Sequence, residues 1–174
     1  MAINLEKRTQ ATMTLRLVSA HDSAIDWANS YQGVSITTEE GETLEDAKKR
    51  TYREDYDTGR LAWAPGDTPT IFAFRHPRIA EVREQIQGKM MALHGIGGKG
   101  GDAGRMAREV WNATFLGTAQ GIGGEVVEVI KQKGRLSEDY VQMLLDAGVF
   151  DELSGAVLSE MNASNVSGER QKKS

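Results

Sequence analysis

The sequence predicts an α+β fold, in which a small β-hairpin or sheet part, residues 1–77, precedes a helical part, residues 78–161. Two patterns support this prediction. Apolar residues of the first half alternate with polar ones at every second position, which is typical of half-buried strands. After Pro77 they recur every three or four residues, which is typical of amphipathic helices. A flexible polar tail, residues 162–174, is expected at the C-terminal end.

The first half contains the strand signals. Residues 13–17 alternate between apolar and polar side chains, so they predict a strand. The runs Leu61-Ala62-Trp63 and Thr70–Phe74 are also β-prone, and the Pro65-Gly66 turn lies between them. Turn-forming residues between two such runs predict a hairpin, which we expect to pack against the helices of the second half.

Between these strands the signals are weaker. Ser23 is a candidate cap for a short helix, and residues 34–38 give another possible strand. Thr43 precedes two acidic residues and is therefore predicted to begin a helix. The charged segment that surrounds it, residues 39–59, is interpreted as a solvent-facing helix or a mobile loop.

The second half is predicted to be helical throughout. Residues 79–93 form an amphipathic helix, and the glycine-rich linker 95–104 separates it from the next one. One stripe then continues to residue 130, with a break or kink at Gly123-Gly124. The predicted stripe consists of Ala107, Trp111, Phe115, Ala119, Ile122, Val126, Val129 and Ile130.

Two shorter helices complete the predicted helical part. Ser137 is predicted to begin one of them, and Gly148 is its expected C-terminal cap. The last helix is predicted to run from Asp151 to Met161. Trp111 and Phe115, on the longer stripe, are expected to anchor the core.

Composition narrows the function classes. The net charge of −4 gives no reason to expect nucleic-acid binding, and the absence of cysteine excludes disulfides and thiolate metal sites. No stretch reaches the ~18 apolar residues of a membrane span, and the first residues lack the apolar run of a signal peptide. A soluble, intracellular protein is the resulting expectation.

No candidate catalytic, cofactor or metal site withstands inspection. Gly95 to Gly100 matches G-x-G-x-x-G, but a predicted helix rather than a strand precedes it, so a linker is favoured over a nucleotide site. His21, His76 and His94 lie on three separate elements without metal-ligand spacing. No nucleophile elbow is present. We therefore predict a protein that is not an enzyme and has no cofactor.

The last two predicted helices offer a candidate binding surface for another protein. Seven apolar residues occur within fifteen positions, more than two short helices are expected to cover, and an uncovered apolar patch usually marks an interface. The predicted partner-binding residues are Leu144, Leu145, Val149, Phe150, Leu153, Val157 and Leu158. The alternative is that these residues close the protein's own core.

Two stretches of sequence resemble the tail assembly chaperones of long-tailed bacteriophages. One is the run 66–77, GDTPTIFAFRHP, and the other comprises 136–141, 150–153 and 156–162 near the C-terminus. The resemblance implies a non-enzymatic protein of the host cytoplasm that binds the tape measure protein and assists tail assembly. A virion structural protein, such as a tail, connector or capsid-decorating subunit, is the alternative. Other virion proteins are then the expected partners, and a homo-oligomer stays open.

Overall fold

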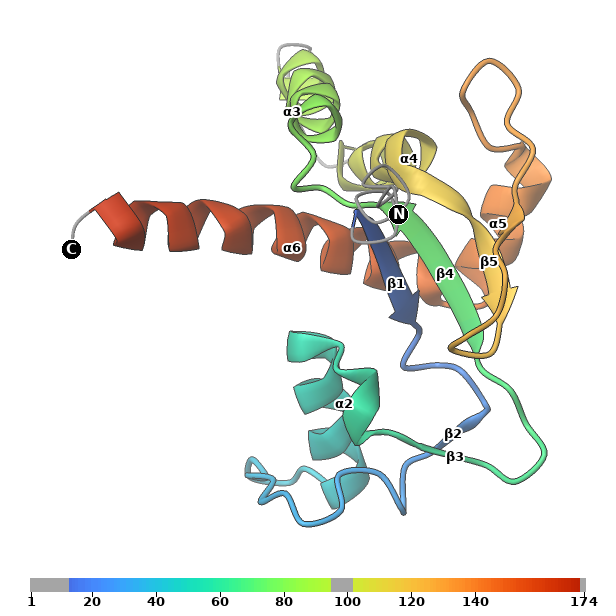
Figure 1. The fold of residues 1–174 in the computed structure, drawn as a ribbon, viewed down its shortest axis with the longest axis vertical. Coiled ribbons are helices and arrows are strands. Elements are labelled where there is room, and N and C mark those ends of the chain that lie inside the picture. The colour runs from blue at the N-terminus through green and yellow to red at the C-terminus, as the bar shows by residue number, and fades with distance from the viewer. Residues whose placement is uncertain (1–12, 95–101, 173–174) are drawn as a thin grey trace, which may run out of the picture.

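The computed structural model describes residues 13–94 and 102–172 and confirms an α+β fold. Its centre is a four-stranded antiparallel sheet (Figure 1). In spatial order the strands are β1 (Thr14–Val18), β4 (Thr70–Arg75), β5 (Phe115–Gln120) and β6 (Val127–Glu128).

Helices cover one face of this sheet. In the view of Figure 1, α4 (Asp102–Thr114), α5 (Glu138–Asp146) and the start of α6 (Val149–Lys172) lie behind the strands. The predicted helix at 79–93 is confirmed as α3 (Ala80–His94), which packs against α4. The far end of α6 extends away from the sheet.

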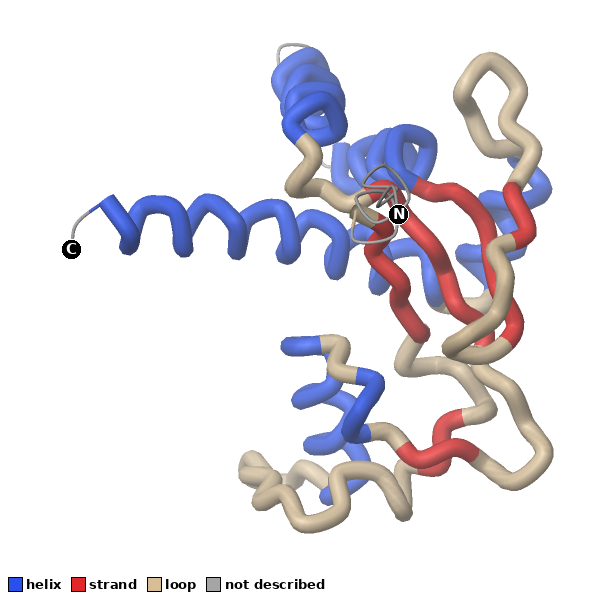
Figure 2. The backbone as a smooth tube through the Cα atoms, in the orientation of Figure 1, coloured by secondary structure: helices blue, strands red, loops and turns tan. Residues whose placement is uncertain are grey.

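An N-terminal lobe, residues 19–63, lies beyond the end of the sheet at which β1 ends and β4 begins (Figure 2). This lobe contains β2 (Ile25–Asp26), α2 (Leu44–Asp55), a short 3-10 helix (Thr58–Arg60) and β3 (Ala62–Trp63) (Figure 2). Thr43 caps α2 as predicted, because its hydroxyl accepts a hydrogen bond from the backbone N–H of Asp46 at 3.1 Å.

The sheet separates two hydrophobic cores, and strand register decides which residue enters which core. Leu17 pairs with Phe72, and their side chains face the helices. Val18 pairs with Ile71, and their side chains face the lobe. Successive residues of a strand therefore point into different cores, as expected from the two-residue repeat of a strand.

The predicted hairpin around Pro65-Gly66 is wrong. The strand at Thr70–Phe74 exists, but β3 pairs with β2 of the lobe, whereas β4 pairs with β1 and β5. Residues 64–69 thus connect two sheets. Asp22 fixes the end of this connection, because its carboxylate accepts the backbone N–H of Thr70 at 2.7 Å.

The predicted helix at Ser23 and the predicted strand at 34–38 are not formed. Asp22 accepts the backbone N–H of Ala24 at 2.9 Å, so the chain turns there instead of continuing into a helix. Residues 34–38 have no regular structure. The charged segment 39–59 is ordered as α2 and the turns on either side of it.

The long helical stripe is wrong beyond residue 114. α4 ends at Thr114, and Phe115 to Gln120 form β5, which is bonded to β4 along its length. Val126 to Ile130 contain β6 instead of a helix. Phe115 and Ala119 fit spacings of both four and two residues, so the stripe was compatible with either structure, and pairing with β4 selected the strand.

Some boundaries of the helical part agree with the sequence predictions and others differ from them. Ser137 caps α5 as predicted, whereas Ala147 is its C-cap in place of the predicted Gly148, which follows at φ 73°. The predicted linker 95–104 is shorter at its C-terminal end because α4 begins at Asp102, while residues 95–101 lie outside the described residues. Residues 162–172, which the sequence analysis assigned to a polar tail, continue α6. Extending an already packed helix costs less than nucleating a new one.

Candidate partner-binding groove

Five of the seven predicted partner-binding residues lie in the protein's own core. Their exposed fractions are between 0% and 5%, so the surface that they form is covered by the protein itself. The buried residues are Leu144, Val149, Phe150, Leu153 and Val157. Leu158 is half-buried against the same core, and Leu145 is 42% exposed. The expectation that all seven form an uncovered patch is therefore wrong.

Trp111 explains this burial. Its ring stacks on Phe150 with a centroid distance of 5.9 Å and an interplanar angle of 5°, and its Nε1 donates a hydrogen bond to the backbone oxygen of Phe150 at 2.8 Å. The sequence presented α5 and α6 as two isolated short helices. It did not show that α4 would pack against α6, and α6 against α5, so that their apolar faces are buried.

A groove remains beside this core, between α4, α5 and the start of α6. We call it the α4–α5 groove. It encloses about 610 Å³. Its apolar lining consists of Leu93, Val141, Leu145 and Phe150. Leu145 is the most accessible of the four, because Leu93 is half-buried and Val141 and Phe150 are only 2% and 3% exposed.

The rim of the α4–α5 groove is charged. Arg108 forms an ion pair with Glu138 at 2.6 Å, and Arg135 forms one with Glu109 at 3.4 Å. Arg105 is exposed at the same rim. An apolar floor with a charged rim is the arrangement that an amphipathic helix with polar flanks can occupy.

A second polar centre joins the lobe to the helices. Glu152 of α6 accepts hydrogen bonds from Ser19 Oγ at 2.5 Å and from the backbone N–H of Ala20 at 2.7 Å, and the Tyr56 hydroxyl lies 3.5 Å from it. Burial, with Glu152 nearby, raises the pKa of Tyr56 above its usual value. This carboxylate therefore holds three chain segments together. No local sequence signal marks Glu152, because its partners Ser19 and Ala20 lie 133 and 132 residues away in the chain.

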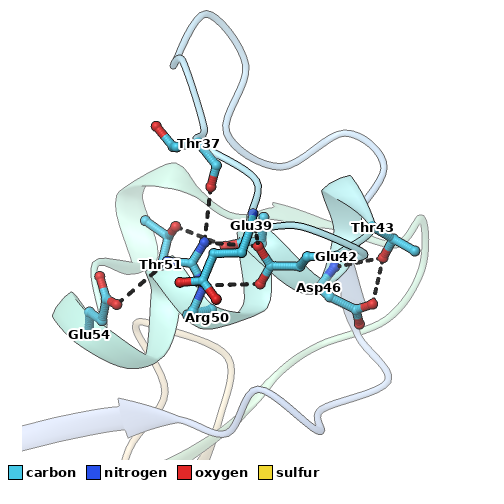
Figure 3. A network of polar contacts seen from close by, with 9 residues as sticks. Thr37, Glu39, Glu42, Thr43, Asp46, Arg50, Thr51 and Glu54 are labelled. Atoms are coloured by element: carbon cyan, nitrogen blue, oxygen red, sulfur yellow. Dashed lines mark hydrogen bonds and ion pairs between the residues drawn. The ribbon is translucent and has the colours of Figure 1, made fainter.

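A third polar cluster lies on α2, within the lobe. Arg50 donates two hydrogen bonds to the carboxylate of Glu42, both at 2.9 Å, and a third at 2.9 Å to the backbone oxygen of Thr37 (Figure 3). The hydrogen bonds from Arg50, together with one from the backbone N–H of Glu39, lower the pKa of Glu42 to about 2. The pocket beside this cluster encloses about 590 Å³ and is lined mostly by charged side chains of both signs. These hydrogen bonds hold the segment that precedes α2 against the helix.

Two of the three histidines, His21 and His76, contact different parts of the molecule. The ring of His21 lies near Gly148, while His76 Nε2 is 3.7 Å from a carboxylate oxygen of Glu160. Burial lowers the pKa of His76. Among residues 13–94 and 102–172, no three His, Asp or Glu side chains are grouped so as to hold a metal ion.

Helix length and hydropathy bear on membrane insertion. Within the part of the chain that the structure describes, no helix combines the length and the apolar composition that crossing a bilayer requires. Comparison of the chain with protein-family models, with curated proteins and with solved structures found no match.

Proposed function

We propose that this protein binds another protein through the α4–α5 groove and has no catalytic activity of its own. The observation that carries the proposal is the combination of an accessible Leu145 with an apolar floor and an arginine-containing rim. Such a surface favours an amphipathic helical segment, whose apolar side chains lose contact with water on binding.

The resemblance to tail assembly chaperones suggests which partner to try first. We propose the phage tape measure protein, bound in the host cytoplasm during tail assembly. In this role the chain would cover apolar stretches of the partner until other subunits replace it. If the chain is instead a virion structural protein, the same groove would receive a neighbouring subunit of the particle.

The test is co-expression with a tape measure protein encoded beside this chain, followed by pull-down. Leu145→Asp places a charge in the groove, and because Leu145 is 42% exposed the variant should still fold. We expect it to bind the partner at least about tenfold more weakly, which corresponds to about 1.4 kcal/mol. Phe150→Asp is unsuitable, since it would put a carboxylate against Trp111 in the core.

A matched control is available on the same helix. Met143 is 52% exposed and does not line the groove, so Met143→Asp adds the same charge to α5 and should bind like the unmodified protein. Equal binding by the two variants would reject the groove as the site. Absence of any interaction, together with recovery of the chain from purified virions in fixed stoichiometry, would support the structural-subunit alternative.

A further inference from the structure

β6 is an edge strand of the sheet and carries unusually exposed apolar side chains. Val127, within the strand, is 74% exposed, and Ile130, just after it, is 87% exposed. Proteins usually shorten, cover or charge such edges, because an unpaired edge can add a further strand. This edge lies on a different part of the molecule from the α4–α5 groove, so a binding site here is independent of the proposed function.

The hydrogen bonds between β5 and β6 show which backbone groups are free for pairing. The N–H of Val129 donates to the oxygen of Leu116 at 2.9 Å, so Val129 points its backbone toward β5. In an antiparallel pair, successive residues alternate in this respect. The backbone N–H and C=O of Glu128 therefore point away from β5, toward the open edge.

Side chains alternate in the same way between the two faces. Val127 pairs with Thr118 and lies on the helix side, whereas Glu128 pairs with Gly117 and lies on the opposite side. There Glu128 borders a shallow groove of about 380 Å³, which Thr14, Arg16, Leu116 and Val126 also line. A strand added at this edge would meet an apolar residue on one face and a carboxylate on the other.

We propose that β6 binds an extended protein segment with the pattern apolar–basic–apolar as a fifth strand. The backbone of the segment would pair with the outward groups of Glu128, and its basic side chain would lie beside the Glu128 carboxylate. The flanking apolar residues would cover Val127 on the helix side. The exposed Glu125 is a second carboxylate near this edge, and the Arg16 guanidinium in the same groove donates to the backbone oxygens of Ile122 and Gly124. The central pattern is the same in either chain direction.

A second copy of this chain fits the same edge less well. In antiparallel self-pairing, residues that oppose each other share a face, so Glu128 would oppose a residue of even number. Lys131 has the wrong parity, and its Nζ already donates to the backbone oxygen of Asn112 at 2.8 Å. Self-pairing therefore supplies no cation for Glu128.

The probe is a pair of short synthetic peptides, Ser-Thr-Val-Lys-Val-Thr-Ser and Ser-Thr-Val-Glu-Val-Thr-Ser, titrated into the full-length protein labelled with ¹⁵N. We expect the lysine peptide to shift the amide signals of residues 125–130 and to bind more tightly than the glutamate peptide. Because an exposed ion pair contributes little, roughly a threefold difference is expected. Signals of the α4–α5 groove should not move.

Two variants make the result decisive. Glu128→Lys should reverse the preference between the two peptides. Glu128→Pro removes an outward N–H without removing a bond to β5, so it should stay folded and lose binding of both peptides. Equal binding of the peptides by the unmodified protein, shifts elsewhere than β6, or a concentration-dependent dimer that Glu128→Pro abolishes would overturn the proposal, the last in favour of a second copy.

Discussion

Polar side chains, in addition to the hydrophobic core, hold the segments of the lobe together. The pair formed by Glu42 and Arg50 is the clearest case, because the guanidinium engages the carboxylate twice and a backbone carbonyl once. The Glu42 side chain is only 15% exposed in this arrangement. A two-bond pair of this kind restricts geometry more than a single contact does.

This pair predicts a specific acid sensitivity. The pKa of Glu42 is lowered to about 2, so the stability that it contributes is fully present above its unfolded pKa of roughly 4.3. That contribution is lost as the pH falls toward 2. Glu42→Gln should therefore weaken the protein near neutral pH but lose less further stability between pH 5 and pH 2 than the unmodified protein, as measured by urea unfolding.

Glu40 provides the control for this experiment. It is exposed and lies two residues away, so Glu40→Gln changes the net charge equally without touching Arg50. Its stability should fall with pH as in the unmodified protein. If Glu42→Gln gave that same curve, the pair with Arg50 would not be responsible for the acid sensitivity.

At the scale of elements, β5 depends on one glycine. Phe74 opposes Phe115 and Ala73 opposes Gly117, so Leu116 is an extra residue and forms a bulge in β5. Gly117 comes directly after this bulge, where the backbone of β6 passes closely. A Cβ atom at Gly117 would overlap the carbonyl oxygen of Val127. The lack of space for a side chain is therefore the reason for glycine at this position.

We predict that Gly117→Ala destabilises the protein by about 2–3 kcal/mol, because β6 must move to admit the methyl group. Gly123→Ala is the matched substitution, since nothing lies within 4 Å of a Cβ at that position. It should change the free energy of unfolding by less than about 0.5 kcal/mol. Equal effects in thermal denaturation would show that β6 adjusts without cost.

Local signals in the sequence were sufficient for some elements and insufficient for others. Thr43 and Ser137 cap their helices because a side chain bonds a backbone group three residues away, which depends on nearby sequence alone. β5 depends on pairing with β4, more than forty residues earlier. The partner of β3 was likewise mispredicted, because its strand, β2, is only two residues long.

The residues of the candidate site could be predicted only in part, because they too depend on contacts between distant segments of the chain. Apolar residues recur along α5 and α6, but their spacing could not show which of them the protein's own core would cover. Leu145 was identified among the seven residues, whereas the arginines of the groove rim were not, since they come from α4 and from the segment before α5. No spacing within the sequence links these segments.

For the whole molecule, Trp111 connects the sheet to the helical layer. It is fully buried, and its ring lies 5.0 Å from Phe74, 4.8 Å from Phe115 and 5.9 Å from Phe150, measured between ring centroids. It contributes to the helix-side core but not to the core of the lobe, which is built around Tyr52 and Trp27. Loss of the Trp111 ring should therefore affect the two sides of the sheet unequally.

We predict that Trp111→Ala costs about 3–5 kcal/mol of stability, because a large buried ring is replaced by a cavity and a buried hydrogen bond to Phe150 is lost. In native-state hydrogen exchange, amides of α4, α5 and α6 should lose more protection than amides of α2. Ile79→Ala, at a half-buried position beside the same core, should cost less and leave this contrast small. Equal loss of protection in α2 and α6 after Trp111→Ala would mean that the two cores unfold as one cooperative unit, with Glu152 and its bonds to Ser19 and Ala20 as the link between them.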